Sequence, residues 1–116
     1  MTTQTLDKNR WDGFLNQLSK GVEGRRAEIS VASLDLGDQV EAEWLPFLGM
    51  TYDRKSDAIE VILEGLEEVI PHPQKLSYVQ DGGNVASVEI IDAQGVQRIV
   101  QLKEPVSLAP PSAGSA

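Results

Sequence analysis

Cysteine is absent from this chain of 116 residues. Its absence excludes disulfide bonds, thiolate metal sites, iron–sulfur clusters and a cysteine nucleophile. Secreted domains of this size commonly carry disulfides, so the lack of cysteine favours the cytoplasm. No apolar run reaches the roughly 18 residues that a membrane-spanning helix needs, and the first residues have neither the basic start nor the apolar stretch of a signal peptide. We expect a soluble cytoplasmic protein without a membrane partner.

Histidine and aromatic residues are scarce: the chain has one His, two Trp, two Tyr and two Phe. A single imidazole excludes zinc sites built from several histidines. Glycine-rich phosphate loops are missing, and so is the Gly-x-Ser-x-Gly elbow of serine hydrolases. One acidic cluster lacks a calcium-loop motif, so we interpret it as a solvated face; it consists of Glu60, Glu64, Glu67 and Glu68. We predict no catalytic residue set, no metal and no cofactor.

Basic residues are a minority, since ten Lys and Arg stand against eighteen Asp and Glu, for a net charge of −8. Residues 1–26 hold five basic and three acidic side chains, whereas residues 27–116 hold five and fifteen. A surface for nucleic acid needs the opposite balance, so we predict no nucleic-acid partner. High like charge on a small body also opposes self-association. We therefore expect a protein that is mainly monomeric.

One amphipathic helix is predicted near the N-terminus. Four apolar residues follow the helical spacing i, i+3, i+4, i+7 and form one stripe: Trp11, Phe14, Leu15 and Leu18. Asp7 is a suitable N-cap, and Leu6 is placed to pack on Trp11 as a hydrophobic staple. Gly21 is expected to end the helix in the left-handed conformation. Gly13 inside the helix costs about 1 kcal/mol relative to alanine.

After Gly24 the apolar period changes from 3.6 to 2, which is typical of strands with one wet face. Seven strands are predicted, over residues 27–31, 40–44, 48–52, 58–63, 76–80, 85–91 and 96–102. Pro46 is expected to separate the second from the third, and the segment between Gly65 and Pro73 shows no clean period. Links of hairpin length indicate antiparallel pairing.

These elements predict an α+β, mainly β fold. The N-terminal helix packs on a strongly curved, mostly antiparallel meander or partial barrel of about six to seven strands. Residues 1–5 are assigned to a flexible N-terminus, residues 6–105 to a single domain, and residues 106–116 to a disordered tail of Pro, Ser and Ala.

The most apolar stretch runs from Trp44 to Tyr52. Aromatic residues and Met dominate interface hot spots, so the stretch is a candidate binding surface, although a core strand pair has the same composition. The candidate surface residues are Trp44, Phe47, Met50, Tyr52 and His72.

His72 lies between Pro71 and Pro73. A residue before proline is pushed toward extended geometry, so we expect a stiff, extended segment there. It is interpreted either as a turn residue or as a general base on a rigid loop.

The landmarks of the chain, taken in order, resemble a family of small uncharacterised bacterial proteins known as a domain of unknown function. The resemblance runs from Trp11 to Leu102. It is carried by Trp11, Phe14, Pro46, Leu48, Gly49, Tyr52, Asp53, Ile70, His72, Pro73, Glu89, Ile90, Asp92 and Gly95. Where such proteins often carry a further His, this chain has Glu67 and Glu68. The resemblance implies a compact, sheet-rich cytoplasmic protein and no particular activity.

Two classes of function remain. The first is a small non-enzymatic binding or accessory protein acting through a sheet face, a sheet edge or the segment from Trp44 to Tyr52, with another protein as its partner. The second is a small hydrolase-like enzyme that uses His72 with nearby carboxylates. An enzyme needs His72 hydrogen-bonded at the base of a cleft, whereas a binding module needs an exposed patch or an unpaired edge.

Overall fold

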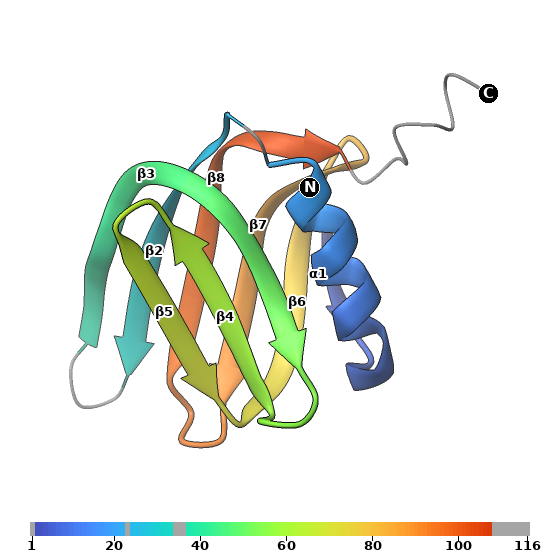
Figure 1. Ribbon diagram of the computed structural model, residues 1–116, viewed down its shortest axis with the longest axis vertical. Coiled ribbons are helices and arrows are strands. Elements are labelled where there is room, and N and C mark those ends of the chain that lie inside the picture. Colours follow the sequence, from blue (N-terminus) through green and yellow to red (C-terminus); the bar gives the residue numbers. More distant parts are fainter. Residues whose placement is uncertain (1, 23, 34–36, 108–116) are drawn as a thin grey trace.

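A computed structural model describes residues 2–22, 24–33 and 37–107. Within these residues, one α-helix and one 3-10 turn accompany eight strands (Figure 1). In chain order they are β1 (Thr2–Leu6), a 3-10 turn (Lys8–Arg10), α1 (Trp11–Lys20), β2 (Arg26–Ser33), β3 (Gly37–Asp53), β4 (Ala58–Leu63), β5 (Leu66–Pro71), β6 (Pro73–Asp81), β7 (Asn84–Asp92) and β8 (Gln97–Ser107). No helix in these three ranges is long and apolar enough to cross a membrane.

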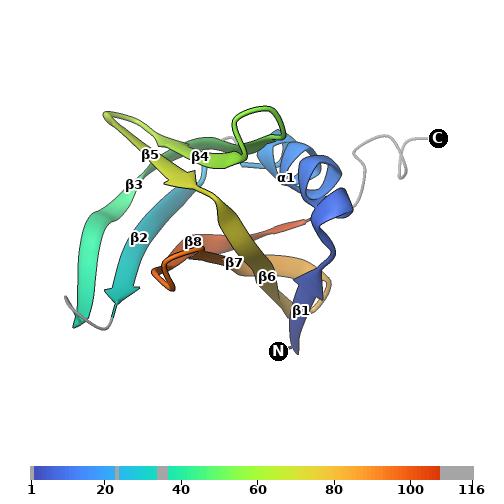
Figure 2. The same ribbon diagram turned by 90° about the horizontal axis from the view of Figure 1, so that it is seen from below.

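All strands belong to one antiparallel sheet of order β1-β6-β7-β8-β2-β3-β4-β5. The sheet does not close, so β1 and β5 are its two edges. Figure 2 shows it curled into a trough, with α1 between β3 and β1 at the open side. This architecture confirms the predicted α+β, mainly β fold with an N-terminal helix on an antiparallel sheet.

The apolar stripe of α1 is fully used in the core. Trp11, Leu15 and Leu18 are at most 1% exposed, and Phe14 is 9% exposed. They pack with the inward-facing side chains of the sheet, among them Ile29, Met50, Ile59, Ile70, Leu76 and Ile90. The helix is held in place by its buried face, since a ten-residue helix is marginal alone.

The two ends of α1 differ from prediction. Asp7 makes no side-chain cap; its main-chain oxygen instead accepts from the Arg10 amide at 2.9 Å, in the 3-10 turn that precedes the helix. Gly21 has φ −102°, so it is not left-handed. A Cβ built on Gly21 would lie 2.8 Å from Val106 Cγ1, so the position needs glycine because β8 passes close to it.

Three strand assignments also differ. Pro46 does not break the chain: β3 continues through it for 17 residues. Pro46 lies where β3 changes partner, since Arg26↔Pro46 ends the pairing with β2 and Phe47↔Leu63 begins the pairing with β4. Proline has no amide hydrogen to donate, and this is tolerated where a strand changes its pairing partner.

The strand β5 was not predicted, because its alternation is masked by charge. Leu66, Glu68 and Ile70 are the more buried residues and Glu67 and Val69 the exposed ones. Glu68 occupies an inward position that an apolar residue normally fills. The strand β5 is held in the sheet by its antiparallel pairing with β4, which runs from Leu66 to Pro71.

The strand β1 was not predicted either. The assignment of residues 1–5 to a flexible N-terminus is replaced by a strand from Thr2 to Leu6 that pairs antiparallel with β6. Four of its five residues are polar and exposed, so the sequence has no alternation of apolar and polar residues that would predict this strand. At the other end, residues 108–116 of the predicted tail lie outside the described residues, while residues 106 and 107 belong to β8.

Candidate functional site

The apolar segment from Trp44 to Tyr52 does not form one exposed surface. Phe47 is 2% exposed and Met50 is fully buried. The Ser19 hydroxyl donates to the Met50 carbonyl at 2.8 Å and accepts from the Met50 amide at 2.9 Å, which docks α1 on β3. Trp44 is half-buried, and its carbonyl accepts from Arg26 Nη1 at 2.9 Å. Phe47 and Met50 therefore serve the core.

Of the five candidate residues, the structure brings Tyr52 and His72 together, through Asp57. The Tyr52 hydroxyl donates to Asp57 Oδ1 at 2.7 Å, and Lys8 Nζ lies 3.1 Å from the same oxygen. His72 Nδ1 lies 3.4 Å from Asp57 Oδ2. The Lys8 ammonium also lies 5.6 Å from the ring centroid of Trp11. The cluster joins the 3-10 turn, the end of β3 and the β5–β6 corner.

The charges in this cluster stabilise one another. The hydrogen bond from Tyr52 lowers the pKa of Asp57 below its ordinary value, and Lys8 and His72 add to that effect. Burial, followed by the bond to Asp57, raises the pKa of Tyr52. The same carboxylate raises the pKa of Lys8. At neutral pH the cluster holds a carboxylate, an ammonium and a neutral phenol.

His72 adopts a left-handed backbone with φ +48°, which corrects the predicted extended geometry. Asp57 has φ +51°. The His72 amide donates to the Asp57 carbonyl at 2.9 Å, and the His72 carbonyl accepts from the Ala93 amide at 3.0 Å. These two bonds fix the corner between β5 and β6 and outweigh the steric preference of a residue before proline.

The His72 side chain is 69% exposed. A hollow of about 340 Å³ beside the cluster is lined by Lys8, Asn9, Tyr52 and Arg54, and His72 is not among its lining residues. A general base works in a cleft that positions the substrate and excludes water, whereas most of the His72 side chain is exposed. The described residues also contain no group of three or more His, Asp or Glu side chains suited to a metal ion.

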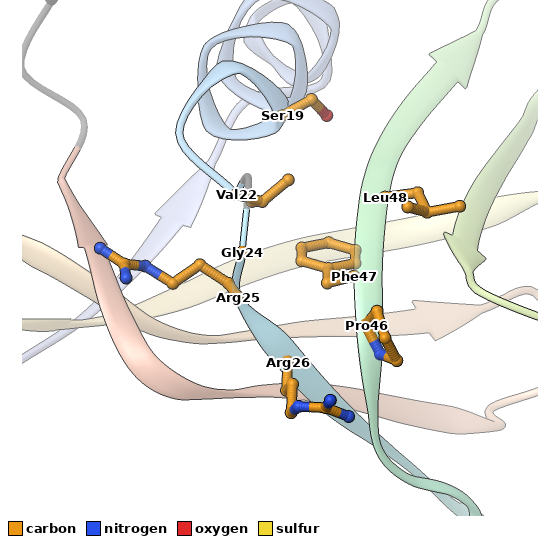
Figure 3. Close-up of a pocket in the computed structure, with 8 residues that line it drawn as sticks. All are labelled: Ser19, Val22, Gly24, Arg25, Arg26, Pro46, Phe47 and Leu48. Atoms are coloured by element: carbon orange, nitrogen blue, oxygen red, sulfur yellow. The ribbon is translucent and has the colours of Figure 1, made fainter.

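A hollow of about 360 Å³ lies between the end of α1 and β3, and Figure 3 shows its lining. The Phe47 ring forms one wall. The Arg25 side chain extends away toward β8, where its Nη1 lies 3.1 Å from Glu104 Oε2. Arg26 is committed to the Trp44 carbonyl. The Arg25 Nε is buried and has no hydrogen-bond partner among the described residues, but none of the five candidate residues except Phe47 lines this hollow.

The two sheet edges differ in their protection. The edge strand β5 carries Glu67, Glu68 and Pro71, which are residue types that discourage further pairing. Glu68 is also bonded across the trough, because Arg98 Nε donates to it at 2.9 Å while Arg98 Nη1 donates to Asp92 at 3.0 Å.

The edge strand β1 has the sequence Thr-Thr-Gln-Thr-Leu, without charge or proline. One side pairs with β6, and none of the other described strands pairs with its second side. Sequence reasoning missed this edge; its one signal was the three threonines, which favour strands.

Another hollow, of about 370 Å³, lies beside β1, between that strand, α1 and β6. Phe14 and Tyr78 stack there with ring centroids 4.6 Å apart. The lining consists of Leu6, Asn9, Arg10, Gly13, Phe14, Gln17 and Tyr78. We call this hollow the α1–β1 groove.

The fold and the site together define a small open-sheet β protein that has an unguarded edge strand and an adjoining groove. The chain belongs to the family of unknown function DUF5335, whose model matches residues 2–111. It is similar to an uncharacterised protein of Aquifex aeolicus (strain VF5), with 30% identity over 109 residues, which are 93% of this chain and 98% of that protein. No solved structure matches it. The resemblance to a domain of unknown function is confirmed.

Proposed function

We propose that this protein is a non-enzymatic cytoplasmic binding protein that takes up an extended segment of a partner protein as a further strand at the free edge of β1. The observation that carries the proposal is the unguarded edge itself. Its outward amides and carbonyls form a template for a further strand, and natural edges of this kind are normally blunted by lysine, proline or a covering element. Strand addition is an established mode of peptide recognition.

The contrast between the two edges supports this assignment. The edge at β5 is protected by charge and proline, so the lack of protection at β1 is a local feature. The strand β1 is nevertheless anchored. It pairs with β6 over five residues, and the Trp11 indole donates to the Leu6 carbonyl at 3.0 Å. A template that is already ordered loses little conformational freedom on binding.

The competing occupant is a second copy of the chain, joined β1 to β1. Net charge −8 on each copy opposes that association, so we assign the edge to a different protein and the free chain to the monomeric state. The hydrolase-like alternative has the weaker support, because the His72 side chain is 69% exposed.

The test compares two identical substitutions. Thr3→Lys places a charge on the edge, whereas Thr51→Lys places one on an exposed residue of β3 that pairs with Glu60 of β4, away from the β1 edge. A phage library of random dodecapeptides is selected on the wild-type chain, and synthetic peptides from it are titrated by calorimetry. We expect Thr3→Lys to weaken binding at least fivefold and Thr51→Lys to change it less than twofold.

Two results would contradict the proposal. One is a selection whose peptides bind the Thr3→Lys and Thr51→Lys proteins equally well. The other is light scattering that gives twice the chain mass of 12.6 kDa for wild type and the single mass for Thr3→Lys. That second outcome would assign the edge to a second copy.

A further inference from the structure

Gly13 has no structural reason to be glycine. It is the third residue of α1 and is exposed, and a Cβ built on it would meet nothing within 4 Å. Glycine inside a helix costs about 1 kcal/mol relative to alanine. In the same helix region, Gly21 is explained by the close approach of Val106. Nothing among the described residues plays that part for Gly13.

Gly13 lines the α1–β1 groove. The apolar walls of the groove come from Leu6 of β1 and from the stacked rings of Phe14 and Tyr78. A bare backbone between these walls allows another chain to lie against the helix, which is a common use of glycine.

Arg10 is the only charged side chain in the lining of the groove. The other four arginines have hydrogen-bond partners: Arg25 on Glu104, Arg26 on the Trp44 carbonyl, Arg54 on the Asn9 carbonyl, and Arg98 on Glu68 and Asp92. The Arg10 guanidinium has no hydrogen bond or ion pair within residues 2–22, 24–33 and 37–107. A guanidinium of this kind is suited to a bidentate bond with a carboxylate.

The groove and the edge are within reach of one peptide. Gln4 pairs with Tyr78 and Leu6 with Leu76, so Gln4 and Leu6 share the face of the sheet on which the groove lies. An added strand lies about 4.8 Å beyond β1, and every second side chain of it points to that face. Such a side chain would lie opposite Gln4 or Leu6, at the mouth of the groove.

We infer that the partner segment is apolar and acidic: one of its aliphatic or aromatic side chains enters the α1–β1 groove between Leu6, Phe14 and Tyr78, and a neighbouring carboxylate pairs with Arg10. Gly13 is bare so that this segment can lie against α1. The inference rests on the proposed strand addition at β1, and it names the chemistry that the partner must have.

The net charge of −8 opposes an acidic peptide less than it opposes a second copy of this chain, because a peptide carries only a few negative charges. At physiological ionic strength, charges separated by more than about 8 Å are largely screened, and the local charge of the groove lining is that of Arg10 alone. Binding should therefore improve at first as salt screens the distant acidic residues.

The test uses two matched pairs of variants and the same dodecapeptide library. Gly13→Gln fills the groove, whereas Asn16→Gln places the same side chain on an exposed residue of α1 outside it. Arg10→Gln removes the cation, whereas Arg26→Gln removes one from an exposed residue of β2 that does not line the groove. We expect sequencing of the wild-type pool to show an apolar residue beside Asp or Glu, and the Arg10→Gln pool to lose the acidic preference.

By calorimetry with one selected peptide, Gly13→Gln and Arg10→Gln should each weaken binding at least fivefold, and Asn16→Gln and Arg26→Gln less than twofold. Thermal unfolding checks that Gly13→Gln folds, since glutamine favours a helix over glycine. If peptides depend on Thr3 but are indifferent to Gly13→Gln and Arg10→Gln, this inference is overturned and the proposed function stands. If they depend on the groove but not on Thr3, both are overturned.

Discussion

The same substitution at two glycines near α1 should change the free energy of unfolding in opposite directions. For Gly13→Ala, the added methyl group meets no atom within 4 Å, so only the difference in helix propensity remains. That difference stabilises the protein by about 1 kcal/mol.

For Gly21→Ala, the backbone angle φ −102° is accessible to alanine, which by itself gains about 0.4–1 kcal/mol. The new Cβ, however, lies 2.8 Å from Val106 Cγ1, and Val106 is 1% exposed and has little room to move. Overpacking of this kind costs about 1–3 kcal/mol. The difference between the midpoints of these ranges is a net loss of about 1.3 kcal/mol.

Urea unfolding followed by tryptophan fluorescence measures both values, with the slope of the transition checked for two-state behaviour. A third protein tests the cause: in a Val106→Ala background the cost of Gly21→Ala should largely disappear. Equal signs for the two glycine substitutions would refute the reasoning. A destabilising Gly13→Ala would show that Gly13 has a role in the fold and would remove the basis for its role in the groove.

Further substitutions test other parts of the structure. Trp11→Ala should destabilise by about 3–5 kcal/mol in urea unfolding, as truncations of buried aromatics do, and a loss below 1 kcal/mol would contradict its place in the core. Burial opposes the charge of Asp92, but hydrogen bonds from Arg98 and two amides hold its pKa below the ordinary value. Ionised Asp92 therefore contributes fully to the free energy of unfolding above about pH 4, and this contribution is lost as pH falls through the lower folded-state pKa. In Asp92→Asn, the free energy of unfolding should fall less steeply with pH below pH 4. An unchanged acid transition would contradict this. Burial and then Glu68 raise the pKa of Glu41, so its charged form is disfavoured in the folded protein. Glu41→Gln should therefore stabilise the protein by a few tenths of a kcal/mol at pH 7 and by less at pH 4. A loss of stability at pH 7 would argue against the like-charge contact.

Strong apolar periodicity made much of the fold predictable. The stripe of Trp11, Phe14, Leu15 and Leu18 predicted a buried helix face, and the structure buries all four. The strands β2, β4, β6, β7 and β8 were predicted close to their observed positions, because each is a short apolar or alternating run bounded by turn residues.

Strands that lack this alternation could not be predicted in the same way. The strand β5 places Glu68 inward because Arg98 reaches it from β8, a partner 30 residues away. The strand β1 is held by main-chain pairing to β6 rather than by an apolar face. Long-range partners of this kind leave no local mark in the sequence.

The candidate site was accessible only in part for the same reason. Scarce aromatic residues favoured a core role for the segment from Trp44 to Tyr52, and Phe47 and Met50 lie in the core. The groove needs Leu6, Gly13 and Tyr78 from three separate elements. The spacing of these residues carries no motif, although the cost of Gly13 inside a helix was visible from the start.

The most direct test of strand addition is amide hydrogen exchange, followed by NMR on the isotope-labelled chain with and without a selected peptide. In a strand, successive amides point to opposite sides, so alternate residues of Thr2–Leu6 face β6 and the others face outward. We predict that the outward amides of β1 become strongly protected when peptide binds, while those of β5 are unchanged. Binding that leaves every β1 amide at its free exchange rate would contradict the account.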